Sequence, residues 1–411
     1  MMISSKDIYK LKDRYWTPIY LFDVWLIKKN IKEYKENFVS TSFDTDVIYA
    51  SKALNIKEML RIVKKEWISL DCVSVWEIYT ALKVKFPTEK IYFHWNNKTY
   101  DDIIFALKHK VWTIVVDNFW ELELLNQLTT KRKQKVNILI RLNVGVSAHT
   151  HKYIVTAHID SKFWVLFGSE EFEKMMNIIN NSKYIQFLWF HSHIWSQIFD
   201  LLAFKEALKK LISYCKSFKE PLILNLWWWF AVHYTDEDAP IPPTEISKKL
   251  INFTEELIQK NWVKIAKLCI EPWRSIVWEA GSTLYTIWYI KKTPSKEYYF
   301  IDGWMTDNIR PALYQAKYDA DVIWKENLPK SKTVTIAGKC CESWDIIIED
   351  CPIQKADSWD LLIIHTTWAY GYSMASNYNK APIPAVVFIE NDKSKLVVKR
   401  QTYEEIIERE V

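Results

Sequence analysis

Several polar residues stand at the ends of apolar, strand-like runs, where a parallel sheet would gather them. Lys52 ends the run YASKA, His191 and His193 lie in FHSHI, and Glu271 and Arg274 lie in EPWRS. A lysine desolvated at such a position has a lowered pKa and is suited to Schiff-base chemistry. A carboxylate against a pyridine nitrogen keeps that ring protonated, which makes the ring a better electron sink.

Each of these features also has a structural interpretation. Lys52 could extend from a strand end to solvent, and Glu271 could form a buried ion pair with Arg274. The H-x-H pair places His191 and His193 on one face of a strand, which would suit a metal-dependent barrel hydrolase. That site would need further histidine or aspartate ligands, and glutamate stands where the last strand would supply an aspartate. The other interpretation is an imidazole lying flat against an aromatic cofactor.

The elements that position these residues alternate in a regular rhythm. Amphipathic, helix-like stretches separate eight strand-like runs, at 46–53, 68–74, 91–95, 113–118, 137–144, 185–194, 222–226 and 265–272. Eight β/α units over about 250 residues predict a TIM barrel, with a doubly wound sheet as second choice. Catalytic groups of such barrels lie at the C-terminal ends of the strands, which here also carry Asp71, His94, Asp117 and Arg141.

After Gly281 the strand-like runs follow one another with few long helices between them, which predicts an all-β domain. The sequence therefore predicts an α/β plus all-β protein: a (β/α)8 barrel over residues 26–280 and a β-sandwich or β-barrel domain over 281–411. Residues 1–25 contain one strand-like run, WTPIYLFD, which is expected to pair into the second domain.

Composition excludes several classes of protein. The net charge is only +5 and the basic residues are dispersed, so nucleic-acid binding is not expected. No apolar run approaches the roughly 18 residues of a membrane span, and the N-terminal residues lack the apolar core of a secretory signal. The six cysteines show no C-x-x-C spacing, which predicts reduced thiols in a cytoplasmic protein.

Tryptophan is unusually frequent and glycine unusually rare. The chain has 22 Trp and 6 Gly, which together match the share of about 7% that glycine alone usually has. Many of the tryptophans stand at turn-like positions, where glycine is favoured. We hypothesise that most or all of them are glycines in the natural protein, as when UGA codons that encode glycine are read as tryptophan. The run LWWWF, residues 226–230, would then be LGGGF, a loop whose backbone N–H groups can approach a phosphate.

With tryptophan read as glycine, the chain resembles the diaminopimelate decarboxylases, pyridoxal-phosphate enzymes with an alanine-racemase-like barrel. The resemblance runs in family order through most of the chain, in the motifs YASKA, DCVSVWE, FHWNNKT, HSHIWSQI, LWWWF, EPWRSIVWEAG, DGWMTDNIRPALY, CESWD and WAYGYSMASNYN.

The resemblance implies pyridoxal 5'-phosphate bound to Lys52 as a Schiff base, with Glu271 at the pyridine nitrogen and His193 stacked on the ring. The other cofactor-binding residues that it implies are Asp71, His94, Ser196, Trp227, Trp228, Trp229, Trp273, Arg274 and Tyr370. The distal end of the substrate would be bound by Arg274, Arg310, Tyr314, Glu342 and Tyr370. Cys341 would donate a proton, and it would come with Glu342 from the partner subunit of a homodimer.

The implied reaction is decarboxylation of meso-2,6-diaminopimelate to L-lysine. One alternative is a related decarboxylase of another basic amino acid or of a carboxylated polyamine. Another is a non-catalytic relative, which the presence of Lys52, Cys341 and Glu342 disfavours.

Overall fold

The computed structural model describes residues 5–144, 163–198, 202–218, 220–230, 241–367 and 370–411. The chain divides into two compact units. The first comprises Asn30–Ala231 and Pro240–Ser275, and the second comprises Met1–Lys29, Val232–Ala239 and Ile276–Val411. The domain boundaries predicted above, at residues 25 and 280, remain predictions.

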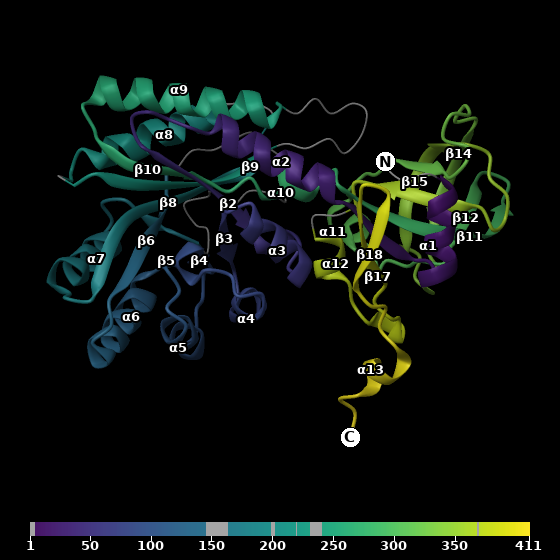
Figure 1. The fold of residues 1–411 in the computed structure, drawn as a ribbon, viewed down its shortest axis with the longest axis horizontal. Coiled ribbons are helices and arrows are strands. Elements are labelled where there is room, and N and C mark those ends of the chain that lie inside the picture. The colour runs from purple at the N-terminus through teal and green to yellow at the C-terminus, as the bar shows by residue number, and fades with distance from the viewer. Residues whose placement is uncertain (1–4, 145–162, 199–201, 219, 231–240, 368–369) are drawn as a thin grey trace. The chain divides into compact units, whose positions relative to one another are not determined.

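The first unit is a closed barrel of eight parallel strands, which confirms the predicted fold (Figure 1). Every neighbouring pair is parallel, and pairing between β5 and β6 closes the barrel. The strands are β2 (Asp44–Ala50), β3 (Ser69–Cys72), β4 (Ile91–Phe93), β5 (Thr113–Val116), β6 (Val136–Asn143), β8 (Ile185–Ile198), β9 (Leu222–Phe230) and β10 (Ile265–Ile270). The short strand β7 (Val165–Leu166) pairs with β6 outside this ring.

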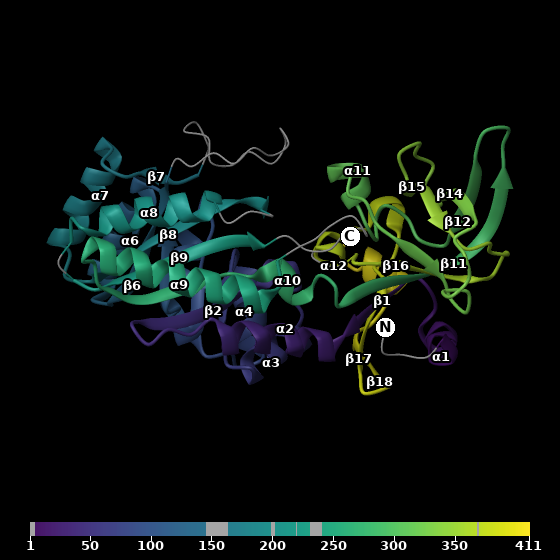
Figure 2. The ribbon, with the colours of Figure 1, turned by 90° about the horizontal axis from the view of Figure 1, so that it is seen from above.

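Helices surround the barrel strands, and local sequence explains where several of them begin (Figure 2). Ser74, Asn118 and Ser169 cap α4, α6 and α7 through their side chains, and Thr99 forms a capping box with Asp102 at α5. The helices are α3 (Lys57–Lys65), α4 (Val75–Lys83), α5 (Tyr100–Lys108), α6 (Phe119–Arg132), α7 (Glu170–Asn181), α8 (Leu202–Cys215) and α9 (Pro243–Asn261). Helices α2 (Val24–Asn37) and α10 (Trp273–Val277) lie where the chain passes between the units.

The second unit is built on a mixed nine-stranded sheet, in line with the predicted β domain. The strand β1 (Ile19–Asp23) lies between β11 (Gly281–Lys292) and β17 (Ala385–Glu390). Leu284 and Tyr285 of β11 belong to two different apolar clusters, so both faces of this strand are covered. The other strands are β12 (Glu297–Ile301), β13 (Ala320–Val322), β14 (Lys332–Ala337), β15 (Ile346–Ile353), β16 (Leu361–His365) and β18 (Lys393–Val398).

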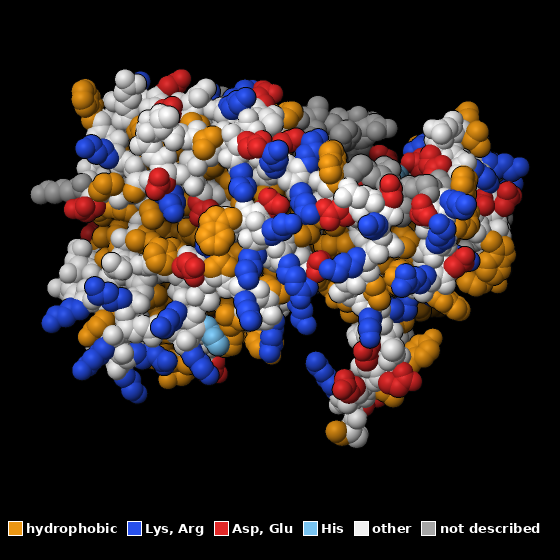
Figure 3. Space-filling view, in the orientation of Figure 1, with side chains coloured by type: hydrophobic (Ala, Val, Ile, Leu, Met, Phe, Trp, Pro, Cys, Tyr) orange, Lys and Arg blue, Asp and Glu red, His pale blue; other side chains and the backbone are white. Residues whose placement is uncertain are grey.

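In the described part of the second unit, four helices and one 3-10 turn accompany the sheet, so the unit is not purely β-stranded. They are α1 (Ser5–Tyr15), α11 (Arg310–Tyr314), α12 (Gly371–Met374), the 3-10 turn η3 (Tyr378–Lys380) and α13 (Tyr403–Ile407). None of the helices in the described residues combines the length and the apolar character needed to span a bilayer. On the face that Figure 3 presents, basic and acidic side chains are interspersed.

Many tryptophans occupy backbone conformations that favour glycine. Among the described residues, eight of the nineteen non-glycine residues with positive φ are tryptophan. Trp262, which ends α9 at φ 57° and is 94% exposed, stands where helices favour a glycine C-cap. These conformations strain any residue that has a Cβ, so they support the hypothesis that glycine stands at these positions. The eight are Trp16, Trp67, Trp95, Trp164, Trp189, Trp262, Trp324 and Trp359.

Candidate active site

The barrel interior changes from apolar to polar toward the C-terminal ends of its strands. Ile48, Tyr92, Val115, Leu139 and Cys269 form one buried apolar cluster. Side chains alternate along a strand, so a residue two positions later lies on the same face. In four of these cases that position is polar and buried: it is Arg141 within β6, and it is His94, Asp117 and Glu271 directly after β4, β5 and β10. The apolar cluster therefore forms a floor beneath a layer of ionisable groups.

Two histidines and two carboxylates meet in this polar layer. Nε2 of His94 lies 3.3 Å from Oε1 of Glu271 and 3.7 Å from Oδ1 of Asp71. The His94 and His191 rings are in edge contact, with centroids 4.7 Å apart. All four side chains are buried. The barrel therefore brings together three residues that the resemblance assigned to the cofactor, Asp71, His94 and Glu271, and adds His191.

Burial sets the protonation of these groups. It raises the pKa of the Glu271 carboxyl, and it raises that of Asp71 well above its usual range, with Glu271 adding to the effect on Asp71. Burial also lowers the pKa of His94 and His191 well below the usual histidine value. The two imidazoles are therefore neutral at neutral pH and can serve as ring contacts or hydrogen-bond partners.

Lys52 lies directly after β2, in the short 3-10 turn η1 (Ser51–Ala53). A single carboxylate fixes this turn, because Oε2 of Glu77 accepts hydrogen bonds from Ser51 Oγ at 2.8 Å and from Val73 N at 2.7 Å. Burial lowers the pKa of Lys52 to about 8, against the partial opposition of Asp71 and Glu271. Lys52 thus has the lowered basicity that Schiff-base chemistry requires near neutral pH.

Sequence reasoning gave no site role to Asn225 or Glu77, and it placed Asp117 and Arg141 at strand ends without assigning them a task. Asn225 of β9 is buried and donates to Oε1 of Glu271 at 2.6 Å. Arg141 of β6 donates to Oδ1 of Asp117 at 3.4 Å and lies 4.6 Å from the Trp164 ring. A polar residue at an inward position of an apolar strand is the signal that could have identified Asn225. Glu77 lay within a quoted motif, but its hydrogen bonds to η1 and the end of β3 cannot be read from spacing.

The described residues fit pyridoxal phosphate. Both carboxylate oxygens of Asp71 and Oε2 of Glu271 are buried without a hydrogen-bond partner among the described residues. A protonated pyridine nitrogen is a donor that such acceptors can bind, and Lys52 would supply the amine for a covalent link. Ligand atoms of His94, His191 and Glu271 also lie within 4.8 Å of one another, a spacing that could hold one metal ion.

Several predicted site residues cannot be placed in full. His193 and Ser196 belong to β8, residues 227–229 to β9, and Trp273 and Arg274 to α10. Their side chains lie outside the part of the structure that is described, so the predicted ring-stacking, phosphate-binding and substrate-binding roles of these seven residues remain predictions.

The second unit holds the remaining predicted residues. The Arg310 guanidinium is buried and lies over three aromatic rings, at 5.2 Å from Trp278, 5.3 Å from Tyr314 and 5.8 Å from Tyr370. Three predicted substrate-binding residues are thus gathered in one cluster. Cys341 and Glu342 lie apart in the chain from this cluster, in the loop between β14 and β15.

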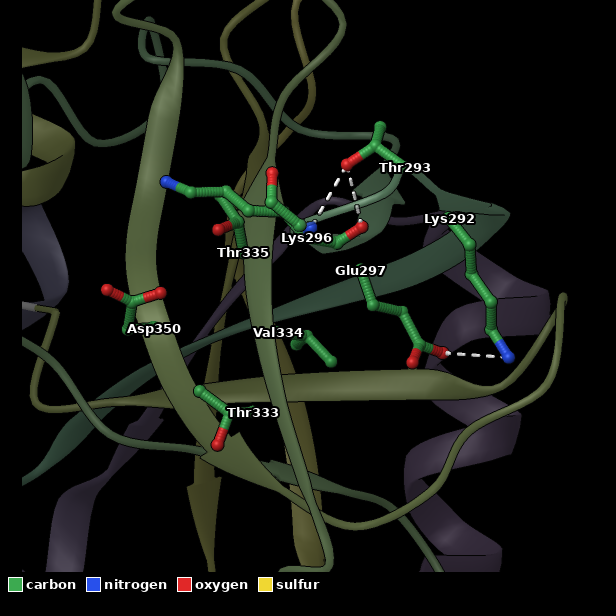
Figure 4. Close-up of a pocket in the computed structure, with 9 residues that line it drawn as sticks. Lys292, Thr293, Lys296, Glu297, Thr333, Val334, Thr335 and Asp350 are labelled. Atoms are coloured by element: carbon green, nitrogen blue, oxygen red, sulfur yellow. Dashed lines mark hydrogen bonds and ion pairs between the residues drawn. The ribbon is translucent and has the colours of Figure 1, made fainter.

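A separate hollow of about 330 Å³ lies on the second unit, beside the turn from β11 to β12 (Figure 4). Three of its four charged lining groups, Lys292, Lys296 and Glu297, form ion pairs, and Asp350 is the fourth. Lys296 lies 2.6 Å from Glu349, and Glu297 lies 3.0 Å from Lys332 and 4.0 Å from Lys292. This hollow is therefore a salt-bridged surface groove and not a candidate for the chemistry described above.

Comparison with known proteins agrees with the barrel site. The family described as "Pyridoxal-dependent decarboxylase, pyridoxal binding domain" matches residues 25–278. The diaminopimelate decarboxylase of Bacillus methanolicus is 45% identical over 405 residues, which cover 97% of this chain and 94% of that protein. That of Bacillus subtilis (strain 168) is 43% identical over 411 residues, with 98% and 94% covered.

Solved structures give the same result. The diaminopimelate decarboxylase from M. jannaschii in complex with L-lysine superimposes with a TM-score of 0.91 at 29% identity, covering 98% of this chain and 94% of that one. The enzyme from Helicobacter pylori complexed with L-lysine gives 0.87 at 29% identity, covering 98% of both chains. The fold, the polar layer around Glu271 and these likenesses agree, and the chain belongs to the diaminopimelate decarboxylases of the pyridoxal-dependent decarboxylase family.

Proposed function

We propose that the protein decarboxylates meso-2,6-diaminopimelate to L-lysine and CO2, the last step of lysine biosynthesis, in the cytoplasm. The observation that carries the proposal is that Lys52, whose pKa burial lowers to about 8, interacts electrostatically with the buried carboxyls of Asp71 and Glu271. A lysine of lowered pKa next to two buried carboxylates is the arrangement that a pyridoxal enzyme needs.

In this proposal, the described site residues of the barrel hold the cofactor. Lys52 provides the amine that links the cofactor covalently. Glu271, which accepts a hydrogen bond from Asn225 and lies beside His94, would bind the protonated pyridine nitrogen of the cofactor. When bound, pyridoxal phosphate supplies an electron sink for the electron pair left on the α-carbon by the departure of CO2.

The second unit would supply the groups that select the substrate and return the proton. Arg310, held among aromatic rings, is suited to a forked contact with the distal carboxylate of diaminopimelate. The Cys341 thiol would donate the proton to the α-carbon, and Glu342 would bind the distal ammonium group. We propose a homodimer in which Cys341 and Glu342 serve the partner's barrel.

The proposal is tested by locating the cofactor and measuring the reaction. The protein is prepared with tryptophan and with glycine at the 22 tryptophan positions, and the form that binds pyridoxal phosphate is used. Borohydride reduction followed by peptide mapping should place the pyridoxyl group on Lys52 and not on Lys98, a buried lysine of the same barrel. Lys52→Ala should abolish both the label and release of CO2 from meso-diaminopimelate.

Two outcomes would overturn the proposal. A label on another lysine would remove the assigned cofactor site. A stoichiometric metal ion in the purified protein, without bound pyridoxal phosphate, would favour the interpretation of His94, His191 and Glu271 as metal ligands. A panel containing L-lysine, L-ornithine, L-arginine and a carboxylated polyamine tests the substrate, and faster turnover of any of these would favour the alternative decarboxylases.

A further inference from the structure

The loop that carries Cys341 and Glu342 has a rigid base. We define the Cys341 loop as residues 338–345. The Asp345 carboxylate accepts hydrogen bonds from Cys340 N at 2.7 Å and from Met305 N at 2.6 Å, and Asp345 N donates to Glu342 O at 3.0 Å. A Cβ at Gly338 would lie 2.3 Å from an oxygen of the same carboxylate. Asp345 therefore fixes the backbone on both sides of Cys341.

A second segment contacts the tip of this loop through two side chains. Tyr378 Oη donates a hydrogen bond to Oε1 of Glu342 at 2.5 Å. The next residue, Asn379, places Nδ2 3.1 Å from Cys340 Sγ. Both come from the short turn η3, and Tyr378 is 44% exposed. The carboxylate of Glu342 is thus held by a phenol from a segment 36 residues further along the chain.

The turn η3 is itself held in place, so Tyr378 is a fixed donor. Asn377 Nδ2 donates to Ala381 O at 2.8 Å and to Gln401 Oε1 at 2.6 Å, and Ser376 N donates to Thr306 O at 3.2 Å. The bonds to Gln401 and Thr306 connect the start of η3 to other parts of the second unit, and the bond to Ala381 joins the two ends of the turn. A donor anchored in this way restricts the carboxylate that it contacts.

We propose that Tyr378 is a positioning residue for substrate specificity: its hydroxyl fixes the Glu342 carboxylate in the orientation that binds the distal ammonium group of the substrate. The inference rests on the proposed function. Tyr378 occupies Oε1 and orients the planar carboxylate, so that Oε2 can accept from an ammonium group. Without the hydroxyl, Glu342 would keep its charge but would sample several rotamers, and substrate binding would have to order it again.

The physical expectation is a loss of binding without a loss of chemistry. Glu342 contacts the distal end of the substrate, away from the carbon that loses CO2. Removing the hydrogen bond should therefore weaken the ground state and the transition state alike, which raises KM and leaves kcat nearly unchanged. Since one charge-assisted hydrogen bond is affected at a partly exposed site, we expect KM for meso-diaminopimelate to rise about 10-fold.

The experiment compares Tyr378→Phe with Tyr289→Phe, which alters an exposed tyrosine of β11 in the same unit. Tyr378→Phe should raise KM about 10-fold with kcat within about 3-fold, and should weaken L-lysine binding, measured by calorimetry, by a similar factor. Tyr289→Phe should change neither. In the Glu342→Gln background, Tyr378→Phe should change KM much less, because the Glu342 carboxylate that accepts the hydrogen bond is gone.

The outcomes separate this inference from the proposed function. Absence of decarboxylation by the unsubstituted protein would remove the proposed function. An active protein in which Tyr378→Phe leaves KM and lysine affinity unchanged would overturn only the inference. A fall in both kcat and melting temperature, with KM unchanged, would assign Tyr378 a structural role. That result would also overturn the inference.

Discussion

Nε2 of His94 lies 3.3 Å from Oε1 of Glu271, and both side chains are buried at the polar end of the barrel. The two residues directly follow β4 and β10, which are not neighbours in the sheet. Burial lowers the pKa of His94 well below the usual histidine value, so the imidazole supports the carboxylate without neutralising it. Burial raises the pKa of the Glu271 carboxyl, and a protonated pyridine nitrogen beside it would favour the charged carboxylate.

The first prediction concerns that charge. Glu271→Gln keeps the size and the hydrogen-bonding shape of the side chain but removes its negative charge. We expect kcat to fall about 100-fold or more, a cost typical of removing a preorganised electrostatic group, while cofactor content stays near one per chain. Steady-state rates and absorbance measure the two quantities. Glu170→Gln, on the exposed surface of α7, is the control, and an unchanged kcat for Glu271→Gln would contradict the role.

The second prediction concerns pH. Burial lowers the pKa of Lys52 from 10.5 to about 8, and only the neutral amine attacks an aldehyde. The rate at which cofactor-free protein binds pyridoxal phosphate covalently should therefore rise with pH and level off above about 8. Stopped-flow absorbance over pH 6.5 to about 9.5 measures it. A rate still rising steeply at the upper end would show an unperturbed lysine.

The same shift has a consequence for stability. Between about 8 and 10.5 the unfolded chain binds more protons at Lys52 than the folded chain does, so the Lys52 contribution makes folding more favourable as pH rises through this window. Cofactor-free Lys52→Met lacks this term. We expect Lys52→Met to be more stable than the unsubstituted protein at pH 8. The difference between their free energies of unfolding, measured by urea denaturation, should become smaller at pH 10.

A third prediction concerns a buried ion pair beside the site. Lys98 Nζ donates to Glu121 Oε1 at 2.7 Å and to Val115 O at 2.6 Å, and it also bonds Trp95 O at 3.1 Å. It thereby ties the loop after His94 to β5 and α6. Lys98→Met leaves a buried carboxylate unpaired and should cost about 3–5 kcal/mol in the free energy of unfolding.

The double variant Lys98→Met/Glu121→Leu is the matched control. It removes both charges together, so it should recover a large part of the loss in urea unfolding. The two residues do not act as a pair if Glu121→Leu lowers the free energy of unfolding as much in the Lys98→Met background as it does alone.

Much of this arrangement could be predicted because it follows from local patterns. Apolar runs that end on Lys52, His94 and Glu271 identified both the barrel strands and the residues at their mouths. Contacts between elements could not be predicted in this way. The approach of His94 to Glu271 depends on closure of the barrel, and the bond from Tyr378 to Glu342 joins separate loops. Very short strands, such as β7 and β13, contain too few residues to show alternation.

The fourth prediction concerns the proposed dimer. Lys52→Ala and Cys341→Ala should each be inactive alone. If Cys341 serves the partner's barrel, one site of a mixed dimer has both residues intact, so an equal mixture should regain roughly a quarter of the unsubstituted activity after subunit exchange. A mixture of Lys52→Ala with Glu271→Gln is the control and should stay inactive, because both changes lie in the barrel. No recovery after demonstrated exchange would count against a shared site.

The last prediction concerns the tryptophans. Within the described residues, eight of them have positive φ, and a side chain there costs on the order of 1–2 kcal/mol each. The sum is comparable with a typical total stability of about 5–15 kcal/mol. The form with tryptophan at all 22 positions should therefore be insoluble or bind no pyridoxal phosphate. The form with glycine at these positions should be soluble, yellow and active, and mass spectrometry of the natural protein should find glycine.

As a local test in the glycine form, returning tryptophan at position 262 alone should destabilise the protein by about 1–2 kcal/mol, because φ there is 57°. Returning it at position 120, inside α6, should be neutral or stabilising, because glycine is a poor helix former. A tryptophan form that is soluble, yellow and active would refute the recoding hypothesis.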